Sequence, residues 1–272
     1  MNKAKVLYVM QEITPYLKEN QISHIGRHLP QGIQERGREI RTFMPRYGNI
    51  NERRNQLHEV IRLSGMNLII DDADHPLIIK VASIQQARMQ VYFIDNEDYF
   101  HRKALYRDKN AKFFEDNDER MIFFARGVME TVKKLGWPPD IIHCHGWFTS
   151  LLPLYIKTAF KDNPLFSDSK VIYSLYDHPF KEKVDEGMIK KLKYDKIKEA
   201  ELKNYKSADY AGLVKGAMQY SDALVIGSEN IDPELTDYAA SLNVPILDFQ
   251  DKDTYIEKYN EFYNELLKDL ED

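Results

Sequence analysis

Two histidines flank the only cysteine of the chain in the stretch IIHCHGW, residues 141–147. Residues of these types serve as metal ligands, as a thiol nucleophile beside a base, or as polar groups that hold a substrate. Two isoleucines precede the histidines and a tryptophan follows, so local packing alone is a fourth possibility. The surrounding sequence has to distinguish these uses.

The spacing supports neither a metal site nor a thiol nucleophile. If residues 140–145 form a strand, His143 and His145 share one face, which gives two ligands where zinc takes four. No carboxylate pattern nearby completes the set. Cys144 then points to the opposite face, away from both potential bases. We therefore expect no metal, no cofactor, and a buried apolar role for Cys144.

The bulk composition is that of an ordinary globular protein. The chain has 272 residues, 43% of them hydrophobic and 30% charged, with a net charge of −5. This acidic balance argues against nucleic acid or an anionic membrane as a partner. One cysteine excludes an internal disulfide. No window resembles a membrane span and the first residues read as a strand, so we expect a cytoplasmic protein.

Strand and helix patterns alternate along the chain and predict an α/β fold. We expect one Rossmann-like domain over residues 1–272, with a doubly wound, mainly parallel sheet and helices on both faces. The expected strands are 5–12, 39–45, 140–145, 170–176, 223–228 and 244–249. The expected helices are 22–33, 118–135, 149–160, 209–221, 233–242 and a closing helix at about 254–270.

Two segments depart from this alternation. Residues 57–95 contain short strand-like runs at 57–65, 67–71, 77–83 and 90–95, which predict an antiparallel hairpin insertion at one side of the sheet. Residues 180–207 are rich in lysine and also carry several acids. A solvated helix with i,i+4 ion pairs is one interpretation of that segment, and a docking surface for an acidic partner is the other.

Ligands of open α/β sheets bind at the carboxyl ends of the strands. That rule selects five stretches, at residues 11–18, 44–47, 143–147, 176–178 and 227–229. The first of them has no GxGxxG motif, so a dinucleotide site is not predicted. Lys18 in this loop could still meet an anion.

Several ordered blocks resemble the bacterial glycogen and plant starch synthases, glycosyltransferase family 5. The opening block resembles the family pattern S-E-x-x-P-[FY]-x-K-T-G-G-L, followed by a helix with L-P and a strand that ends in P-R-Y. Residues 91–100, 116–147 and 206–228 are similar to later blocks, including H-x-H-D-W. The matching positions in the opening block are Glu12, Pro15, Tyr16, Lys18, Leu29, Pro30, Pro45, Arg46, Tyr47 and Gly48.

The resemblance implies the N-terminal half of a two-domain, GT-B glycosyltransferase. It implies an α-1,4-glucan acceptor, an ADP- or UDP-glucose donor, and metal-independent glucosyl transfer with retention. His145 would contact the transferred glucose as the catalytic residue, and Lys18 would lie on the donor phosphate side. The acceptor residues implied are Asp116 and Asn117. Trp147 and Tyr99 are further acceptor candidates, since aromatic rings at the edge of the sheet could stack on sugar rings.

The chain also departs from the family pattern. The K-T-G-G-L loop reads Lys18–Ile22 without its glycine pair and with Glu19 added, and the aspartate of H-D-W is Gly146. Only about 44 residues follow Ser228, too few for a second Rossmann domain, so a separate chain or a homo-oligomer would supply the donor half. The alternative functions are a catalytically inactive glucan-binding or regulatory protein and a protein-docking module.

Overall fold

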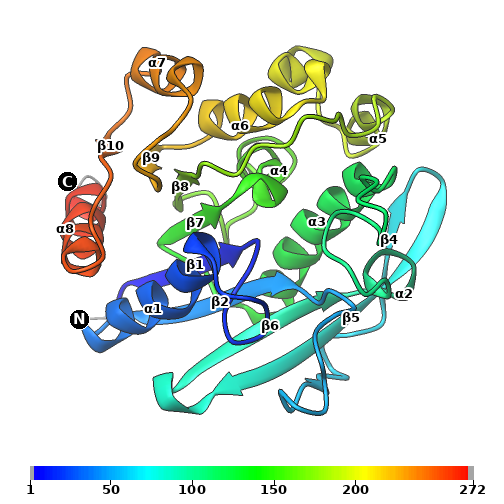
Figure 1. Cartoon of the computed structure of the whole chain (residues 1–272), viewed down its shortest axis with the longest axis horizontal. Helices are drawn as coiled ribbons and strands as arrows, with labels where there is room; N and C mark the ends of the chain where they lie inside the picture. The colour runs from blue at the N-terminus through cyan, green and yellow to red at the C-terminus, as the bar shows by residue number, and fades with distance from the viewer. Residues whose placement is uncertain (1–2, 269–272) are drawn as a thin grey trace.

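A computed structural model describes residues 3–268 and is built on one ten-stranded mixed sheet. The strand order is β10-β9-β8-β7-β1-β2-β6-β5-β3, with β4 paired to β5 beside this path (Figure 1). The six pairs from β10 to β6 are all parallel. The predicted α/β class with a mainly parallel, doubly wound sheet is confirmed.

The predicted strands and helices occur in the predicted order, and the short helix α2 was not predicted. The strands are β1 (Lys5–Met10), β2 (Glu39–Pro45), β3 (His58–Glu59), β4 (Met66–Ile70), β5 (Ala73–Ile84), β6 (Met89–Asp95), β7 (Ile141–His145), β8 (Lys170–Leu175), β9 (Ala223–Ile226) and β10 (Ile246–Leu247). The α-helices are α1 (Gln21–Glu35), α2 (Glu97–Phe100), α3 (Asn117–Leu135), α4 (Leu151–Lys157), α5 (Met188–Tyr194), α6 (Tyr210–Gln219), α7 (Pro233–Ser241) and α8 (Tyr255–Lys268). Short 3-10 turns lie at Gln85–Ala87, Trp147–Thr149, Glu199–Leu202 and Asn204–Ser207.

Helices cover both faces of the sheet. On one face α1 packs on β1 and β2 and contacts α8, while on the other α3, α4 and α6 lie against one another and against β6 and β8 (Figure 1). The contact between α1 and α8 is close, because a Cβ atom at Gly32 would lie 2.5 Å from Ile256. The predicted closing helix is thus present as far as the described residues extend, and its last two predicted residues lie outside them.

The strand order reverses between β1 and β7, which are neighbours in the sheet. From β1 the chain proceeds through β2 to β6, and from β7 it proceeds in the other direction to β8, β9 and β10. Such a reversal leaves a crevice where the loops after the two central strands diverge. The loops that follow β1 and β7 are those that begin at Gln11 and Gly146.

The hairpin insertion is confirmed, although one of its predicted strands was wrong. Strand β5 is antiparallel to β6 and to β4, and it extends the parallel sheet on one side. Within 57–65 only His58 and Glu59 pair with β5, and both side chains are exposed. The rest of the run is a turn rather than a strand, in which Leu63 is buried and Ile61 is 82% exposed.

Local chemistry explains where the two longest helices begin and end. Asn20 caps α1, since its side chain accepts from the Ser23 N–H while Ser23 Oγ accepts from the Asn20 N–H. Acidic residues occupy the first turn of α3 and lysines its last, as the helix dipole favours. Gly136 ends α3 in the left-handed conformation with φ of +56°.

The lysine-rich segment 180–207 is not one solvated helix, which corrects that interpretation. It contains α5 and two 3-10 turns, with buried anchors at Met188, Leu192 and Leu202. These apolar residues are too widely spaced for one continuous amphipathic stripe, so the segment folds as short turns against the body of the protein.

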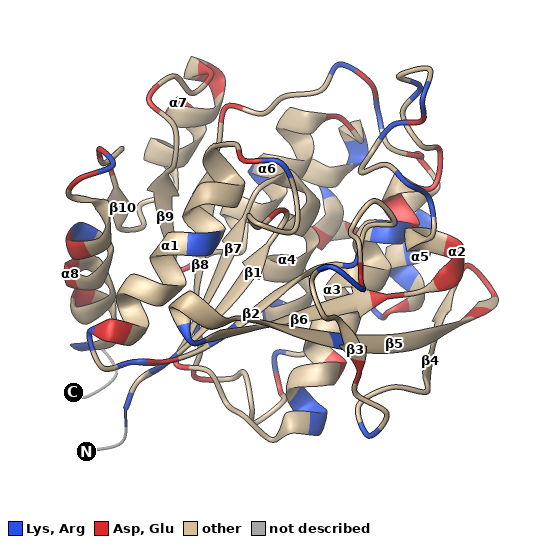
Figure 2. Cartoon of the chain, turned by 60° about the horizontal axis from the view of Figure 1, so that its bottom comes forward, with Lys and Arg blue, Asp and Glu red and all other residues tan. Residues whose placement is uncertain are grey.

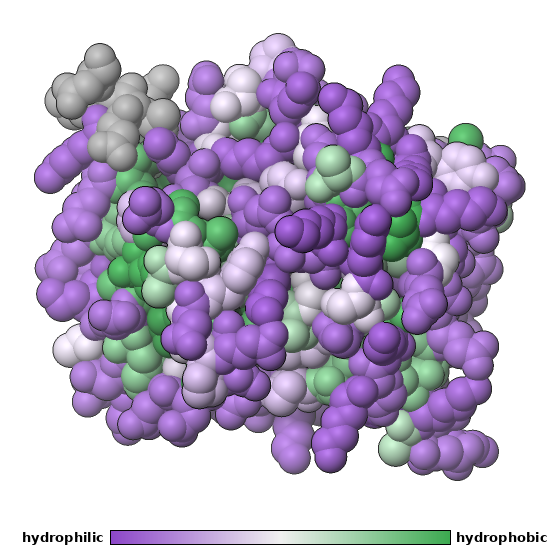
Figure 3. Space-filling model, turned by 90° about the horizontal axis from the view of Figure 1, so that it is seen from above, coloured by the Kyte–Doolittle hydropathy of each residue, from purple (hydrophilic) through white to green (hydrophobic). Residues whose placement is uncertain are grey.

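Hydrophilic residues cover most of the face shown in Figure 3, and hydrophobic residues show through in small groups. Among residues 3–268, no helix combines the length and the apolar character that crossing a membrane requires.

Candidate functional site

The carboxyl edge of the sheet brings together side chains from distant parts of the chain. Gln11 and Glu12 follow β1, and Gly146 and Trp147 follow β7 at the strand reversal. Both Gln11 and Glu12 are buried, with exposed fractions of 0% and 3%. This edge is the candidate site, since loops of parallel strands meet there.

His143 and His145 lie on the face of β7 that α8 covers. His143 is bonded to Tyr263 through Nδ1 at 2.5 Å and to Ser174 through Nε2 at 2.7 Å. His145 Nδ1 lies 2.8 Å from the Tyr176 hydroxyl, and its Nε2 has no partner among the described residues. Burial lowers the pKa of His145 to about 3, and burial and the adjacent His145 lower that of His143 well below its usual range. Both rings are therefore neutral.

Cys144 occupies the other face of the same strand and is completely buried. Burial raises the pKa of its thiol, so the thiolate is disfavoured. No group of three or more potential metal ligands occurs among residues 3–268. Neither observation supports a nucleophile or a metal centre at this stretch.

Tyr106 joins the loops of the site and was missed in the sequence, because it lies in an irregular segment with no periodic pattern. Its hydroxyl lies 3.0 Å from that of Tyr47 and donates to Glu12 Oε1 at 3.2 Å. Its ring packs on Trp147, with 4.8 Å between ring centroids. Its carbonyl accepts from the Asn117 side chain at 3.0 Å. One residue therefore connects the loops after β1 and β7 to the start of α3.

Trp147 lies at the predicted edge but is only 3% exposed. Besides Tyr106, Phe180 also packs on its ring, with 4.7 Å between ring centroids. In this conformation little of the indole surface is open to a ligand. The ring instead holds the 3-10 turn after β7 against the loop that contains Phe180.

Glu12 is a buried carboxylate with neutral donors. Asn20 Nδ2 donates to its Oε2 at 2.6 Å, and Gln11 Nε2 and the Tyr106 hydroxyl donate to Oε1 at 3.2 Å each. No cation lies within ion-pairing distance among the described residues. Three donors satisfy a carboxylate that burial would otherwise penalise.

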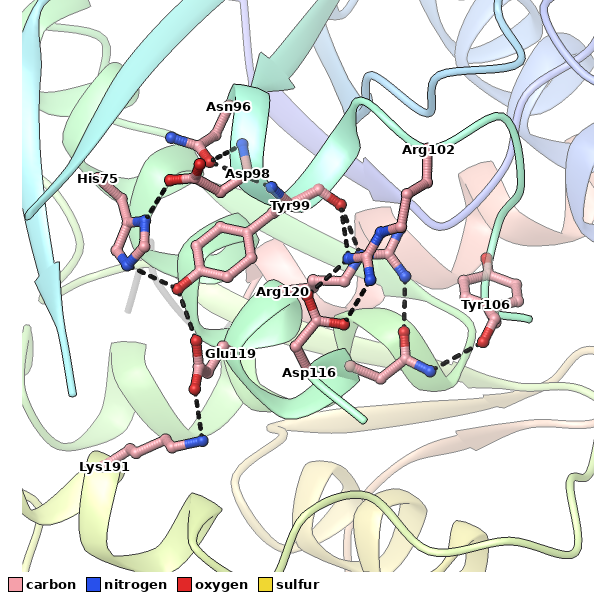
Figure 4. Close-up of polar contacts among 11 residues, drawn as sticks. His75, Asn96, Asp98, Tyr99, Arg102, Tyr106, Asp116, Glu119, Arg120 and Lys191 are labelled. Atoms are coloured by element: carbon pink, nitrogen blue, oxygen red, sulfur yellow. Dashed lines mark hydrogen bonds and ion pairs between the residues drawn. The ribbon is translucent and has the colours of Figure 1, made fainter. Parts of the chain in front are cut away.

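Asp116 stands at the start of α3 and is held by Arg102 (Figure 4). Asn117 follows it and accepts a hydrogen bond from Arg120. Arg102 forms a bidentate pair with Asp116, with distances of 2.6 and 2.9 Å. The Asp116 side chain is 30% exposed, whereas Asn117 is fully buried. Asp116 is thus the member of this predicted pair that reaches the surface.

Arg120 is the second residue that the sequence analysis missed. It is fully buried, donates to the Tyr99 carbonyl at 2.8 Å and to Asn117 Oδ1 at 2.6 Å, and has no partner for Nη2 among the described residues. Burial lowers its pKa to about 10. A signal existed, since a charged residue four positions before Phe124 falls on the apolar stripe of a predicted helix. The rings within 6 Å of its guanidinium are Tyr47, Phe100, Phe114 and Phe148.

Tyr99 belongs to a second branch of contacts from α3 (Figure 4). Its hydroxyl donates to Glu119 at 2.8 Å and contacts His75 at 2.9 Å, and the residue is 3% exposed. Glu119 also pairs with Lys191 of α5 at 2.7 Å. Tyr99 is therefore packed inside the fold, where it contacts Glu119 of α3.

Lys191 attaches the lysine-rich segment to α3, where basic residues around α5 face acidic ones (Figure 2). It lies 2.8 Å from Asp118 and 2.7 Å from Glu119, and its side chain is 9% exposed. One cation serves two carboxylates here, and burial raises the pKa of Asp118 to about 6 despite the attraction of Lys191. The same carboxylates raise the pKa of Lys191, which stays charged.

Lys18 is exposed in the loop between β1 and α1, apart from the buried residues described above. Glu19 follows it and pairs with His24 at 2.9 Å. The structure therefore joins Asn117 and Trp147 through Tyr106, while it leaves Lys18 at the surface and turns His145 toward α8.

The comparisons with known proteins agree on one family. A sequence profile described as "Starch synthase catalytic domain" matches residues 5–243. The glycogen synthase of Chlorobium limicola is 41% identical over 174 residues, which cover 64% of this chain and 36% of that protein. The glycogen synthase of Chlorobium phaeovibrioides is 34% identical over 244 residues, which cover 87% of this chain and 48% of that protein.

A solved structure has the same fold. The catalytic domain of starch synthase IV from Arabidopsis thaliana, bound to ADP and acarbose, matches 93% of this chain and 53% of that chain, with a TM-score of 0.70 and 18% identity. The chain thus spans between about a third and a half of the length of the relatives it matches. By the match over residues 5–243, this chain belongs to the family of the starch synthase catalytic domain.

Proposed function

We propose that this chain binds an α-1,4-glucan along the carboxyl edge of its sheet, as the acceptor-binding part of a glycogen- or starch-synthase-like glucosyltransferase. The observation that carries the proposal is the family match over residues 5–243, which includes the loops after β1, β2, β6, β7 and β8. In an open parallel sheet these loops meet at one edge, around the strand reversal.

Asp116 is the residue that we assign to the glucan hydroxyls. Its carboxylate reaches the surface beside Arg102, and carboxylates accept hydrogen bonds from sugar hydroxyls. Asn117, Tyr99 and Trp147 lie behind this surface. We assign them to the acceptor side through the loops that they hold, and we assign His145 to the wall nearest the transferred glucose.

The loop expected to face the donor has few features that suit a nucleotide sugar. The loop after β1 offers Lys18 to a phosphate, but it lacks a glycine pair and adds Glu19 next to the cation. A carboxylate at that place opposes the binding of a diphosphate. We therefore propose that nucleotide-glucose binding and transfer need groups from another polypeptide segment or a second chain. A glucan-binding protein without transferase activity is the second candidate, favoured by Gly146 and Glu19.

Isothermal titration calorimetry with maltoheptaose and with ADP-glucose, run separately, tests this proposal. We expect heat of binding with maltoheptaose and none with ADP-glucose. Asp116→Asn keeps the shape of the side chain and removes its charge, and it should weaken maltoheptaose binding by about tenfold, the effect of one hydrogen bond to a charged group. Asp168→Asn is the matched control, because Asp168 is an exposed acid just before β8, at the opposite edge.

The absence of maltoheptaose binding by the wild-type chain would refute the glucan proposal. Glucan binding together with glucose transfer from ADP-glucose by the 272-residue chain alone would refute the need for further donor groups. Binding without transfer, both alone and with a donor-domain chain added, would select the non-catalytic candidate.

A further inference from the structure

Gln11 lies at the strand reversal and contacts three other parts of the edge. The residue is fully buried directly after β1. Its side chain contacts the backbone after β7, the neighbouring Glu12, and His178 in the loop after β8. We propose that Gln11 is a positioning residue which fixes His178 as a hydrogen-bond donor toward the ligand at this edge.

The orientation of the Gln11 amide follows from its partners. Phe148 contributes a backbone N–H at 3.0 Å, and an N–H group only donates, so the atom facing it is Oε1. The Nε2 group therefore points the other way and has two hydrogens to give. One goes to Glu12 Oε1 at 3.2 Å and the other toward His178 Nδ1 at 3.3 Å.

This orientation selects one tautomer of His178. Because Gln11 Nε2 can only donate, His178 Nδ1 has to accept and carries no proton. In the neutral ring the proton then resides on Nε2. The His178 side chain is exposed, so this N–H is presented at the surface of the candidate site.

The backbone around His178 is held from several sides. The Tyr176 carbonyl accepts from the His178 N–H at 2.9 Å and from the Tyr210 hydroxyl at 2.6 Å. The Asp177 N–H donates to Ser228 Oγ at 3.0 Å. A ring held at its backbone and at Nδ1 has a defined direction for the remaining N–H group.

Gly146 allows the Gln11 side chain to lie at the strand reversal. Its φ is +87°, and a Cβ atom at this position would lie 2.5 Å from Gln11 Oε1. A side chain at residue 146 and the Gln11 amide therefore exclude each other. The glycine that takes the place of the family's aspartate and the Gln11–His178 contact are two parts of one local arrangement.

An exposed Nε2–H group recognises an acceptor oxygen, which could be a glucan hydroxyl or a phosphate of a nucleotide sugar. The ligand contact rests on the proposed function, since it needs a ligand at this edge. The positioning by Gln11 does not, because it is a property of the free protein.

The tautomer is measured by long-range ¹H–¹⁵N correlation NMR on the free protein. We expect the pattern of a neutral ring protonated at Nε2 for His178, and in Gln11→Met, which keeps the length but not the polar atoms, an average of both tautomers. An Nδ1-protonated ring in the wild type would overturn the assignment. The wild-type spectrum decides this point even if Gln11→Met does not fold.

The ligand contact is measured by calorimetry on His178 variants with maltoheptaose and ADP-glucose in separate arms. His178→Phe should weaken one of the two ligands by about 5- to 10-fold, and His178→Gln, which retains an N–H donor, should recover part of this loss. His58→Phe, at an exposed histidine of β3, should change neither.

Wild-type affinity in His178→Phe for every ligand that the wild type binds would overturn the contact and leave the proposed function intact. If the wild type binds neither ligand, the proposed function and the contact both fail, while the NMR result still decides the role of Gln11.

Discussion

Two polar clusters at the carboxyl edge differ in how they satisfy their buried groups. The cluster at the strand reversal, called the switch-point cluster, consists of Gln11, Glu12, His145, Gly146 and His178. It uses neutral donors and acceptors around one carboxylate, and it ends in an exposed histidine. The α3 cluster pairs carboxylates with arginine and lysine, and it encloses a fully buried guanidinium. It consists of Arg102, Asp116, Asn117, Asp118, Glu119, Arg120 and Lys191.

The difference suggests two roles: the switch-point cluster presents a polar group to a ligand, and the α3 cluster stabilises the loops around it. At the strand reversal, neutral donors satisfy the one buried carboxylate, Glu12, and His178 is left exposed to a ligand. In the α3 cluster most charged atoms pair with one another, while Arg102 Nε, Asp118 Oδ1 and Arg120 Nη2 have no partner among the described residues. Its main effect is therefore to fix the loops around the start of α3. Four experiments test this distinction.

Arg120→Met should have the largest effect on stability. The substitution removes the donor of the Tyr99 carbonyl and of Asn117 and leaves both acceptors buried. Each buried acceptor left without a donor costs about 1–3 kcal/mol, so we expect a loss of about 3–5 kcal/mol in the free energy of unfolding, measured by urea denaturation. Arg120→Lys keeps the charge but not the two-pronged geometry and should recover only part. A loss below about 1 kcal/mol would mean that Arg120 does not support the α3 cluster.

Gly146→Ala should destabilise the switch-point cluster by about 3 kcal/mol, through backbone strain and overlap with Gln11. Gly65→Ala is a matched control, because Gly65 has the same φ of +87° and no atom of residues 3–268 lies within 4 Å of its Cβ position. That control should cost only about 1 kcal/mol, the strain alone. Shortening the neighbour in Gln11→Ser/Gly146→Ala should return part of the difference, and strict additivity of the two changes would contradict the contact.

Acid should affect the two clusters in opposite directions. The folded pKa of His145, about 3, lies below its unfolded value of about 6.5, so its contribution to stability is present above pH 6.5 and is lost as the pH falls toward 3. The folded pKa of Asp118, about 6, lies above its unfolded value of about 3.9, so its contribution is present below pH 3.9 and is lost as the pH rises through 6.

Urea denaturation between pH 4 and 7 measures both contributions. His145→Gln should make the loss of stability in acid shallower by up to about 1.4 kcal/mol per pH unit, and Asp118→Asn should make it steeper between pH 4 and 6. Asp168→Asn, at an exposed acid, should leave the slope near that of the wild type. Shifts of the same sign in the first two variants would contradict the distinction between the clusters.

Arg102→Met should have the smallest effect. Arg102 and Asp116 have side chains about a third exposed, at 33% and 30%, so their pair contributes less than about 1 kcal/mol. Thermal unfolding monitored by circular dichroism should show a shift of at most a few degrees. A loss of stability as large as that of Arg120→Met would mean that the partly exposed pair of Arg102 and Asp116 stabilises the α3 cluster as much as the buried Arg120 does.

The sequence was sufficient for the order of the elements and for the family. Buried parallel strands are continuous apolar runs and the helices carry apolar stripes, so both appear in local patterns. Alternation along residues 141–145 also separated Cys144 from the histidines, because the faces of a strand follow from its backbone. The extent of 57–65 and the shape of 180–207 were wrong, since 57–65 turns after two paired residues and 180–207 folds as short elements against α3.

Only the tertiary structure decided which polar groups are free. Gln11 meets the backbone of Phe148 across 137 positions of sequence and His178 across 167, and Tyr106 meets Glu12 across 94. No local pattern encodes such partners, because they depend on how loops from different strands converge. The residue types thus determined the kind of edge this protein has, whereas the convergence of its loops determined that His178 is exposed while His145, Asn117 and Trp147 are enclosed.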